Sequence, residues 1–274
     1  MIYDGKRASI EIQNALREQV AKLSSPPSLA VISASSHPSI ASFIKIKRKF
    51  GEAIGVTVNE FNFPESIGGE QLILEIQKIL QEKEYTGAVV QLPLPSSYNV
   101  EKILSALPQS LDVDILGKNA WEDFVKHGTN VPPVAGAVAH ILNDTKTEIH
   151  GKNIVIIGQG RLVGLPVTTW LKHQGVTPHI VDITTSDEVR MKLYKEADIV
   201  VTGIGSPHHL RPEYFKNNVI LIDAGTSEQS GVLAGDCNPD CATTALVFTP
   251  VPGGVGPLTV AHLFKNIVGA ACSL

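Results

Sequence analysis

Three closely spaced glycines stand where a chain could cradle a phosphate group. Gly158, Gly160 and Gly164 follow an apolar run at residues 153–157, and a helical pattern comes after them. In dinucleotide-binding turns the first glycine allows a tight turn, the second admits a pyrophosphate, and the third lets helix and strand pack closely. The helix then offers free N–H groups to the phosphates. We predict a nicotinamide cofactor site here; the alternative is a glycine-rich turn that binds nothing.

An acidic residue ends the next apolar run and bears on the choice of cofactor. Asp182 lies about 20 residues beyond the glycines, where a carboxylate accepts hydrogen bonds from the ribose hydroxyls of NAD and repels the 2′-phosphate of NADP. Alternatively, Asp182 only caps the loop into Ser186. Arg161 could face a phosphate, so the sequence favours NAD and leaves NADP open. The predicted cofactor-binding residues are Gly158, Gln159, Gly160, Arg161, Leu162, Gly164, Asp182, Gly205 and Thr226.

The first half of the chain carries a different set of reactive side chains. Phe43 and Lys47 are four residues apart, so they share one face of a helix, and Lys45 and Lys49 point elsewhere. A lysine can transfer protons near neutral pH only if partial burial lowers its pKa. Taken by itself, Lys47 is more simply one member of a solvated basic face.

Further polar residues follow other elements. Gln91 stands at the carboxyl end of a predicted strand, the edge at which ligands bind in open α/β sheets. Asp112 and Asp114 lie in a later loop. Residues 249–259 read TPVPGGVGPLT, and so many prolines and glycines exclude an ordinary helix or central strand. We expect a specially shaped loop there.

The elements that must position these residues alternate along the chain. Apolar runs at residues 29–32, 56–61 and 87–92 predict strands, and residues 39–54 and 69–83 predict helices between them. After a looser stretch at 108–133, the alternation resumes. Helices are predicted at residues 135–142, 166–173, 186–195 and 258–271, and strands at 153–157, 179–182, 199–202 and 219–223. The pattern predicts an α/β fold with parallel sheets and two domains.

Composition excludes several classes of function. The net charge of −4 and the absence of long charge blocks disfavour nucleic acid or an anionic membrane as a partner. Three cysteines without a CxxC pair argue against a disulfide framework or a zinc site, and they fit a reduced, cytoplasmic setting. The first residues lack a secretory h-region, and no apolar run reaches membrane-spanning length.

Several segments together resemble the methylenetetrahydrofolate dehydrogenase/cyclohydrolase family. Residues 249–259 are similar to the family's TPVPGGVGPMT, residues 90–95 to its VQLPLP, and residues 111–114 to its KDVDG. Residues 151–166 resemble its GKxxxVIGRSxxVGxP, and ADIV at 197–200 and IDAG at 222–225 match two further strands. The resemblance spans nearly the whole chain, and the motif at 249–259 is the most specific.

The resemblance implies a two-domain architecture and a homodimer. A catalytic folate-binding domain would comprise residues 1–130 with the C-terminal segment 250–274, whose helix returns to it. Residues 131–249 would form a Rossmann NAD(P)-binding domain, with the active cleft between the two domains. Members of the family usually dimerise through the Rossmann domain.

The same resemblance implies roles for individual residues. Lys47 would be the catalytic lysine, Gln91 would hold its amine, and Asp114 would bind the pterin ring. Phe43, Leu92, Pro252, Gly253 and Gly254 would contact the folate substrate. No metal is implied. The expected reaction is oxidation of 5,10-methylenetetrahydrofolate to the methenyl form with NAD(P)+, followed by hydrolysis to 10-formyltetrahydrofolate.

Departures from the family pattern leave alternatives open. Phe43 replaces the family's tyrosine, and Leu111 and Ile115 replace the lysine and glycine of KDVDG. PPVAG stands at 132–136 instead of PCTPxG, and DIT at 182–184 replaces a histidine–serine–arginine stretch. Gln159 and Gly160 replace the arginine and serine of the phosphate turn. A dehydrogenase with weak or lost hydrolysis or an altered substrate, and a catalytically silent NAD-binding sensor, therefore remain possible.

Overall fold

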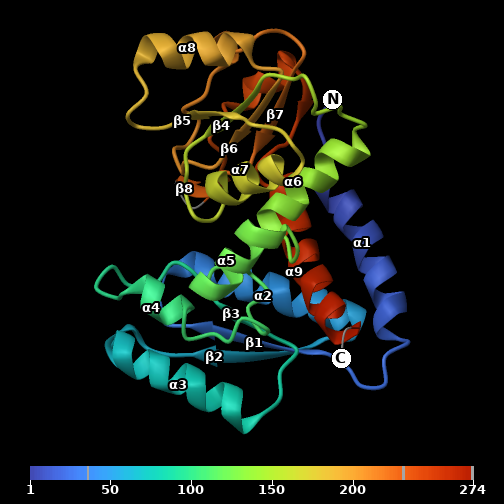
Figure 1. Cartoon of the computed structure of the whole chain (residues 1–274), viewed down its shortest axis with the longest axis vertical. Coiled ribbons are helices and arrows are strands. Elements are labelled where there is room, and N and C mark those ends of the chain that lie inside the picture. The colour runs from blue at the N-terminus through green and yellow to red at the C-terminus, as the bar shows by residue number, and fades with distance from the viewer. Residues whose placement is uncertain (36, 230–231, 273–274) are drawn as a thin grey trace. The chain divides into compact units, whose positions relative to one another are not determined.

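The computed structural model describes residues 1–35, 37–229 and 232–272, and these residues form two compact units (Figure 1). The three-stranded unit comprises residues 10–133 and 260–274, and the five-stranded unit comprises residues 1–9 and 134–259. The divisions fall within helices α1 (Gly5–Val20) and α9 (Val255–Cys272). The predicted boundaries instead gave residues 1–9 and 250–259 to the first domain and residues 131–133 to the second.

The three-stranded unit is built on a parallel sheet with strand order β2-β1-β3. Its strands are β1 (Ser28–Ser33), β2 (Thr57–Asn62) and β3 (Gly87–Val90). Its other elements are α2 (Pro38–Ile54), η1 (Glu65–Ile67), α3 (Gly69–Glu82), α4 (Val100–Leu104) and α5 (Lys118–His127). Figure 1 shows the sheet lying between α2 and α3. The carboxyl ends of β1 and β3 therefore meet at one edge, and Gln91 directly follows β3 there. Asp112, two residues before Asp114, forms a parallel bridge with Ala88 of β3.

Side chains of β1 alternate between two hydrophobic cores, as a strand buried on both faces requires. Leu29 and Val31 pack with α2 and α9, whereas Ala30 and Ile32 pack with α3 and α4. Every residue of β1 is buried. The main apolar faces of α2 and α3 thus pack on opposite faces of this sheet.

Helix α9 is the main apolar element of the C-terminal segment. Its 18 residues have a mean hydropathy of 1.2, and by length and composition alone the helix could cross a membrane, although no apolar run of that length was predicted. Phe264 and Ile267 are nevertheless fully buried, and Phe264 stacks on Phe50 with ring centroids 5.0 Å apart. Core packing accounts for the apolar composition of this helix.

The five-stranded unit is a doubly wound parallel sheet with strand order β10-β7-β6-β4-β5. Its strands are β4 (Ile154–Ile157), β5 (His179–Val181), β6 (Ile199–Thr202), β7 (Val219–Asp223) and β10 (Ala245–Phe248). The helices and short hairpin of this unit are α6 (Pro133–Asp144), α7 (Gly164–His173), α8 (Asp187–Glu196), η2 (Pro212–Tyr214), η3 (Pro239–Thr243), β8 (Ser227–Gln229) and β9 (Val232–Ala234). Strand β4 pairs with β5 on one side and β6 on the other. Such a reversal of strand order opens a crevice at the carboxyl ends of the strands, where ligands bind.

Candidate functional site

A partly buried hydrogen bond joins two residues 44 positions apart in the three-stranded unit. Lys47 on α2 donates from Nζ to Oε1 of Gln91, just beyond β3, at 2.6 Å. The amide nitrogen of Gln91 in turn donates to the carbonyl oxygen of Leu92 at 2.8 Å. Because both ends of this amide are engaged and Gln91 is buried, its oxygen is held toward the lysine.

Lys47 also interacts electrostatically with Asp114. Burial lowers the pKa of Lys47, and the negative charge of Asp114 opposes this effect. Burial likewise raises the pKa of Asp114, and the charge of Lys47 opposes that shift. Desolvation thus pushes each group toward its neutral form, while their mutual attraction favours the charged pair. The two pKa shifts together bring the neutral and the charged forms of the pair closer in free energy.

The loop that carries Asp114 is fixed by its neighbour Asp112. The buried Asp112 carboxylate accepts the N–H of Ile115 at 2.8 Å and that of Gly117 at 2.7 Å. Burial raises the pKa of Asp112 to about 6, and the hydrogen bonds to its carboxylate oppose that shift. Ile115 adopts a left-handed backbone conformation with φ +59°, which is an outlier for a β-branched residue. Asp112 and Ile115 stand out in the sequence, but the hydrogen bond between them was not predicted.

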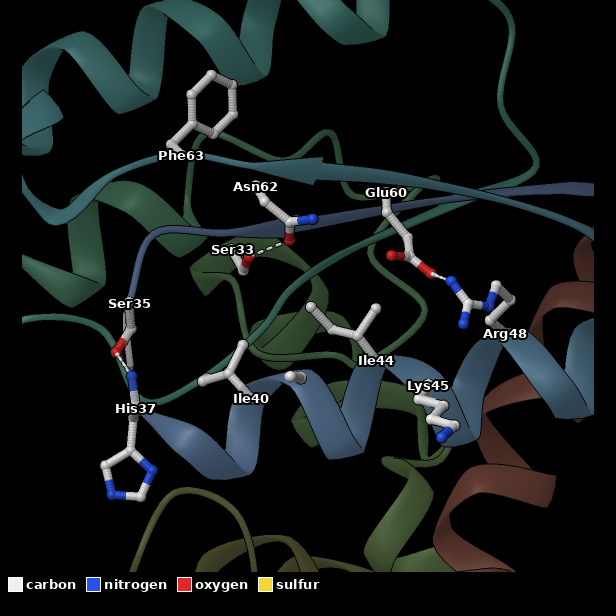
Figure 2. A pocket seen from close by; sticks show the side chains of 11 residues that line it. Ser33, Ser35, His37, Ile40, Ile44, Lys45, Arg48, Glu60, Asn62 and Phe63 are labelled. Carbon is white, nitrogen blue, oxygen red and sulfur yellow. Dashed lines mark hydrogen bonds and ion pairs between the residues drawn. The ribbon is translucent and has the colours of Figure 1, made fainter.

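The predicted substrate-binding residues of this unit lie on the same two elements. Phe43 stands one turn before Lys47 on α2 and is half-buried, and Leu92 packs against the core next to Gln91. A separate hollow of about 520 Å³ lies between α2 and strands β1 and β2 (Figure 2). Arg48 and Glu60 form an ion pair of 3.2 Å in its wall, and neither Lys47 nor Gln91 lines it. This hollow is therefore distinct from the Lys47 site.

The glycine turn of the five-stranded unit has the shape of a phosphate-binding turn. Gly158 has φ +84°, and α7 begins at Gly164, where an added Cβ would lie 1.9 Å from the carbonyl oxygen of Gly158. An added Cβ at Gly160 would find no atom closer than 4.0 Å, so the space beside this residue is open. Gln159 turns inward, since its amide donates to the Thr168 hydroxyl at 3.1 Å. The open space at Gly160 and the start of α7 fit a dinucleotide pyrophosphate.

The remaining predicted cofactor residues lie around the carboxyl ends of these strands. Gly205 follows β6 with φ +68°, Leu162 is half exposed within the glycine turn, and Thr226 is exposed after β7. Among the described residues, no group of three or more His, Cys, Asp or Glu side chains is arranged to hold a metal ion.

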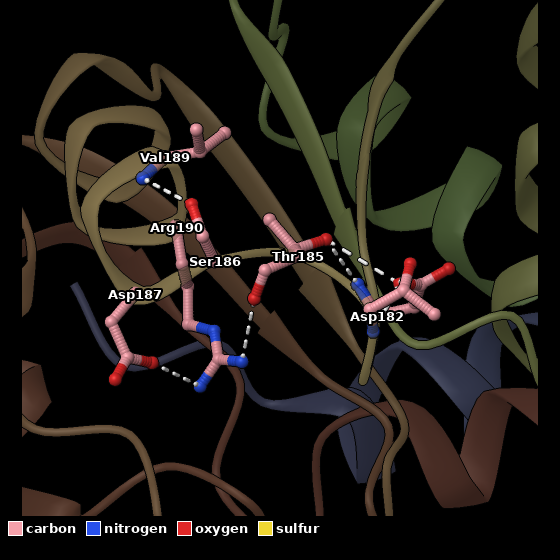
Figure 3. Close-up of polar contacts among 7 residues, drawn as sticks. Asp182, Thr185, Ser186, Asp187, Val189 and Arg190 are labelled. Carbon is pink, nitrogen blue, oxygen red and sulfur yellow. Dashed lines mark hydrogen bonds and ion pairs between the residues drawn. The ribbon is translucent and has the colours of Figure 1, made fainter.

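Asp182 lies directly after β5 and uses one carboxylate oxygen within its own loop (Figure 3). Oδ1 accepts the N–H of Thr184 at 2.8 Å and its hydroxyl at 2.6 Å. These bonds lower the pKa of Asp182, so the carboxylate is ionised at neutral pH. Arg190 on α8 donates to the Thr185 carbonyl at 3.1 Å and pairs with Asp187 at 3.3 Å. Oδ2 of Asp182 has no hydrogen bond within the described part of the chain.

The segment 249–259 is only partly the loop that its composition predicted. The Thr249 hydroxyl accepts the N–H of Asp223 at 2.7 Å, and the N–H of Gly254 closes a turn on the Pro250 carbonyl at 2.7 Å. The prediction was wrong for the second half, because α9 begins at Val255 and includes Pro257. Proline is tolerated there because N–H groups in the first turn of a helix have no partner within it.

Close packing around Gly253 and Gly254 sets the backbone conformation of the loop residues that would contact substrate. Gly253 has φ +113°, and an added Cβ at Gly254 would lie 2.7 Å from that of Thr249. An added Cβ at Gly5, the start of α1, would meet the carbonyl oxygen of Gly254 at 1.8 Å. Pro252 lies in the turn between these contacts. The structure thus gathers the predicted residues into two groups, one within each unit.

Comparison with known proteins decides the family. Residues 3–114 match the family model described as tetrahydrofolate dehydrogenase/cyclohydrolase, catalytic domain, and residues 132–274 match that of the NAD(P)-binding domain. The chain belongs to the tetrahydrofolate dehydrogenase/cyclohydrolase family. The bifunctional protein FolD of Nautilia profundicola is 34% identical over 98% of this chain and 96% of its own length. The resemblance predicted from the sequence motifs is therefore confirmed.

Solved structures of the tetrahydrofolate dehydrogenase/cyclohydrolase family agree with the fold. The bifunctional enzyme FolD from Campylobacter jejuni superposes with a TM-score of 0.93 at 30% identity, covering 100% of this chain and 99% of its own. The Trypanosoma brucei dehydrogenase–cyclohydrolase, solved with NADP and an inhibitor, also has a TM-score of 0.93, at 31% identity over 100% and 97% of the two chains. The predicted two-domain α/β fold and a nicotinamide dinucleotide as cofactor are thereby supported.

Proposed function

We propose that this protein oxidises 5,10-methylenetetrahydrofolate to the methenyl form with NAD(P)+ and then hydrolyses the methenyl form to 10-formyltetrahydrofolate. The observation that carries the proposal is the partly buried Lys47–Gln91 hydrogen bond of 2.6 Å, together with the charge of Asp114 acting on Lys47, in a chain of this family. A nicotinamide ring accepts a hydride from the folate carbon, which needs orientation and no protein base. Gly158, Gly160 and the first turn of α7 would hold the pyrophosphate of the cofactor.

Lys47 would act in the hydrolytic step. The oxygen of water bonds to the methenyl carbon while the Lys47 amine accepts a water proton. The bond from that carbon to N5 then breaks, N5 takes a proton from the lysine, and the remaining hydroxyl proton leaves to give the formyl group. A lowered pKa increases the fraction of neutral amine able to accept the first proton. Gln91 would orient the amine, and Asp114 would accept hydrogen bonds from the pterin ring.

The test follows formation of the methenyl chromophore and then its decay. Lys47→Met should lower the hydrolytic rate by about 10²–10⁴-fold, the usual contribution of a general acid–base group. Lys45→Met is the matched control, because Lys45 is an exposed lysine of the same helix and lies outside the proposed machinery. We expect the control to keep both activities. Undiminished hydrolysis in Lys47→Met would refute the role assigned to this lysine.

We further propose a preference for NAD over NADP. Oδ1 of Asp182 is occupied by Thr184, which leaves Oδ2 to accept a ribose hydroxyl, and the ionised carboxylate would repel a 2′-phosphate. The guanidinium of Arg190 is engaged by Thr185 and Asp187, so it is not poised for that phosphate. The T. brucei relative was solved with NADP. The proposed preference for NAD therefore rests on the side chains of Asp182 and Arg190 in this chain.

The cofactor preference is tested by comparing kcat/KM for the two nucleotides. A hydrogen bond to a charged group contributes about 1.5–3 kcal/mol, so we expect NAD to be favoured by roughly tenfold or more. Asp182→Ser should reduce this ratio toward unity. A clear preference of the unmodified protein for NADP would overturn the proposal.

A dehydrogenase with weak hydrolysis is the second candidate function. Phe43 offers an apolar ring but no hydroxyl, and Ile115, with a branched side chain and a left-handed backbone conformation, follows Asp114 where the family motif has glycine. These differences favour a slower methenyl hydrolysis without affecting hydride transfer. Persistence of the methenyl absorbance after oxidation would identify this activity, and an absence of any methenyl product would identify a silent nucleotide-binding protein.

The assembly and setting of the protein are inferred from its family and its thiols. We infer a homodimer, and light scattering of the purified protein tests it, with a monomer at micromolar concentration as the contrary result. The three cysteines are free thiols, and Cys237 and Cys241 are buried. Free thiols are typical of a reducing compartment, which supports a cytoplasmic location.

A further inference from the structure

The loop that follows β6 packs directly on the glycine turn of the cofactor site. An added Cβ at Gly203 would lie 2.5 Å from that of Val163, and one at Gly158 would lie 2.7 Å from Cγ2 of Ile204. Because β6 and β4 are neighbours in the sheet, this loop forms one wall of the crevice at the carboxyl ends of the strands. The backbone shape of residues 203–206 therefore sets the room available to a dinucleotide.

A buried carboxylate holds this loop in shape. Asp236 is fully buried and accepts three hydrogen bonds from the chain around the end of β6. Oδ2 accepts the Thr202 hydroxyl and the Ile204 N–H, each at 2.8 Å, and Oδ1 accepts the Ser206 N–H at 2.9 Å. No ion pair to Asp236 occurs within the described ranges. The donors to its carboxyl oxygens therefore belong mainly to the loop backbone.

Asp236 is itself fixed by a second buried carboxylate. Oδ1 of Asp223, the last residue of β7, accepts the N–H of Asp236 at 3.1 Å, and Oδ2 accepts the N–H of Cys237 at 2.8 Å. An added Cβ at Gly225 would lie 2.5 Å from the Asp236 carboxylate, so the side chain has no room to swing aside. Hydrogen bonds thus connect the end of β7 through Asp236 to the loop after β6.

We propose that Asp236 is a positioning residue for cofactor binding, which sets the conformation of residues 203–206 through their N–H groups. This inference rests on the proposed function, because the site it shapes is that of the nicotinamide dinucleotide. The role depends on an acceptor at both oxygen positions, since each faces a backbone N–H. In Asp236→Asn, either orientation of the amide would direct its NH₂ group at one of those N–H donors.

The experiment measures dissociation constants of the full chain for NAD+ and NADP+ by calorimetry without folate. We expect Asp236→Asn to raise the dissociation constant of the preferred nucleotide at least tenfold and to raise its KM more than it lowers kcat. Hydrogen exchange should become faster at the amides of Ile204 and Ser206, while the Gly158 amide, bonded to the Val181 carbonyl at 2.7 Å, should remain protected. An unchanged dissociation constant in the folded variant would overturn the inference.

Asp198→Asn is the matched control, because Asp198 precedes the opposite end of the same strand. Its carboxylate accepts the N–H of Asn153 at 2.8 Å and pairs with Lys216 at 2.7 Å. Asp198→Asn therefore weakens contacts of the same unit and leaves the contacts of residues 203–206 unchanged. We expect nucleotide affinity to remain within twofold of the unmodified protein. An equal loss of affinity in this control would assign the effect to stability and overturn the positioning role.

A milder variant keeps the test decisive if Asp236→Asn does not fold. Thr202→Val removes one of the three hydrogen bonds and keeps the shape of the side chain, so it should raise the dissociation constant severalfold. Unchanged affinity in Thr202→Val would then overturn the inference. If the unmodified protein binds neither nucleotide, the proposed function is refuted as well. If the unmodified protein and the variants all bind with the same affinity, only the role of Asp236 is refuted.

Discussion

Replacement of Ile115 separates the backbone strain of the Asp114 loop from the packing of its side chain. Ile115 is 2% exposed, has φ +59°, and donates its N–H to Asp112 at 2.8 Å. Glycine, the residue of the family motif KDVDG, adopts this conformation freely, whereas alanine retains a Cβ and its strain. Ile115→Gly and Ile115→Ala both lose the buried side chain, so their difference reports the strain.

The expected magnitudes decide the order of stability. Loss of the buried side chain costs about 2–5 kcal/mol in both variants. A Cβ in the left-handed region costs about 1–2 kcal/mol, which only glycine recovers. Glycine also loses about 0.5–1 kcal/mol through the greater freedom of the unfolded chain. The unmodified protein should therefore be the most stable, and Ile115→Gly should exceed Ile115→Ala by about 0.5–1 kcal/mol.

Urea denaturation of the three proteins at neutral pH measures these free energies of unfolding. Ile103, a fully buried residue in helix α4, supplies the matched control. There the order must reverse, because glycine in a helix is about 1 kcal/mol less favourable than alanine. If Ile115→Ala proves the more stable at position 115 as well, the left-handed conformation carries no strain and the reasoning is refuted. In Ile115→Gly, the KM for folate should stay within a few-fold, since Asp112 still holds the loop.

Two further predictions concern the glycine turn and a buried acid. Gly164→Ala should lower the Tm by several degrees or prevent folding, because its Cβ would lie 1.9 Å from the Gly158 carbonyl, whereas Gly160→Ala should keep the Tm and weaken only nucleotide binding. The Asp112 pKa of about 6 lies above the usual value of 3.8, so this carboxyl stabilises the fold at low pH and loses that contribution as pH rises through 6. Relative to Asp112→Asn, the unmodified protein should lose up to about 3 kcal/mol of unfolding free energy between pH 4 and 7, and a flat difference would contradict the assigned burial.

Much of the secondary structure could be predicted because the relevant signals are local. The alternation of apolar runs and amphipathic stretches predicted β1, α2 and β4 within two residues of their observed bounds. Helix α5 was missed inside the stretch expected to be loose. Its ends carry glycine rather than a side-chain cap, and its core contacts are few, with Ala120 and Phe124 buried. No polar capping residue therefore marked this helix in the sequence, although its residues are amphipathic, and Phe124 is fully buried in the folded chain.

The start of α9 shows where composition misleads. Pro257 and Gly256 suggested an irregular loop, yet both lie in the first turn of the helix. Proline and glycine are costly in the middle of a helix. They cost little in its first turn, where the N–H groups have no partner within the helix, and the composition of a short segment does not distinguish these two positions.

The sequence by itself determined the family, the alternation of strands and helices, and the residue types at the reactive positions, because motif order and periodicity are properties of the chain. Only the tertiary structure decided how those residues are used. It joined Lys47 to Gln91 across 44 positions, turned Gln159 inward to Thr168, and left one oxygen of Asp182 available. It also brought Asp236 to the loop after β6, where it accepts the N–H of Ile204. Hydrogen-bond partners and burial set the pKa and orientation of a side chain, and both arise only when distant segments pack together.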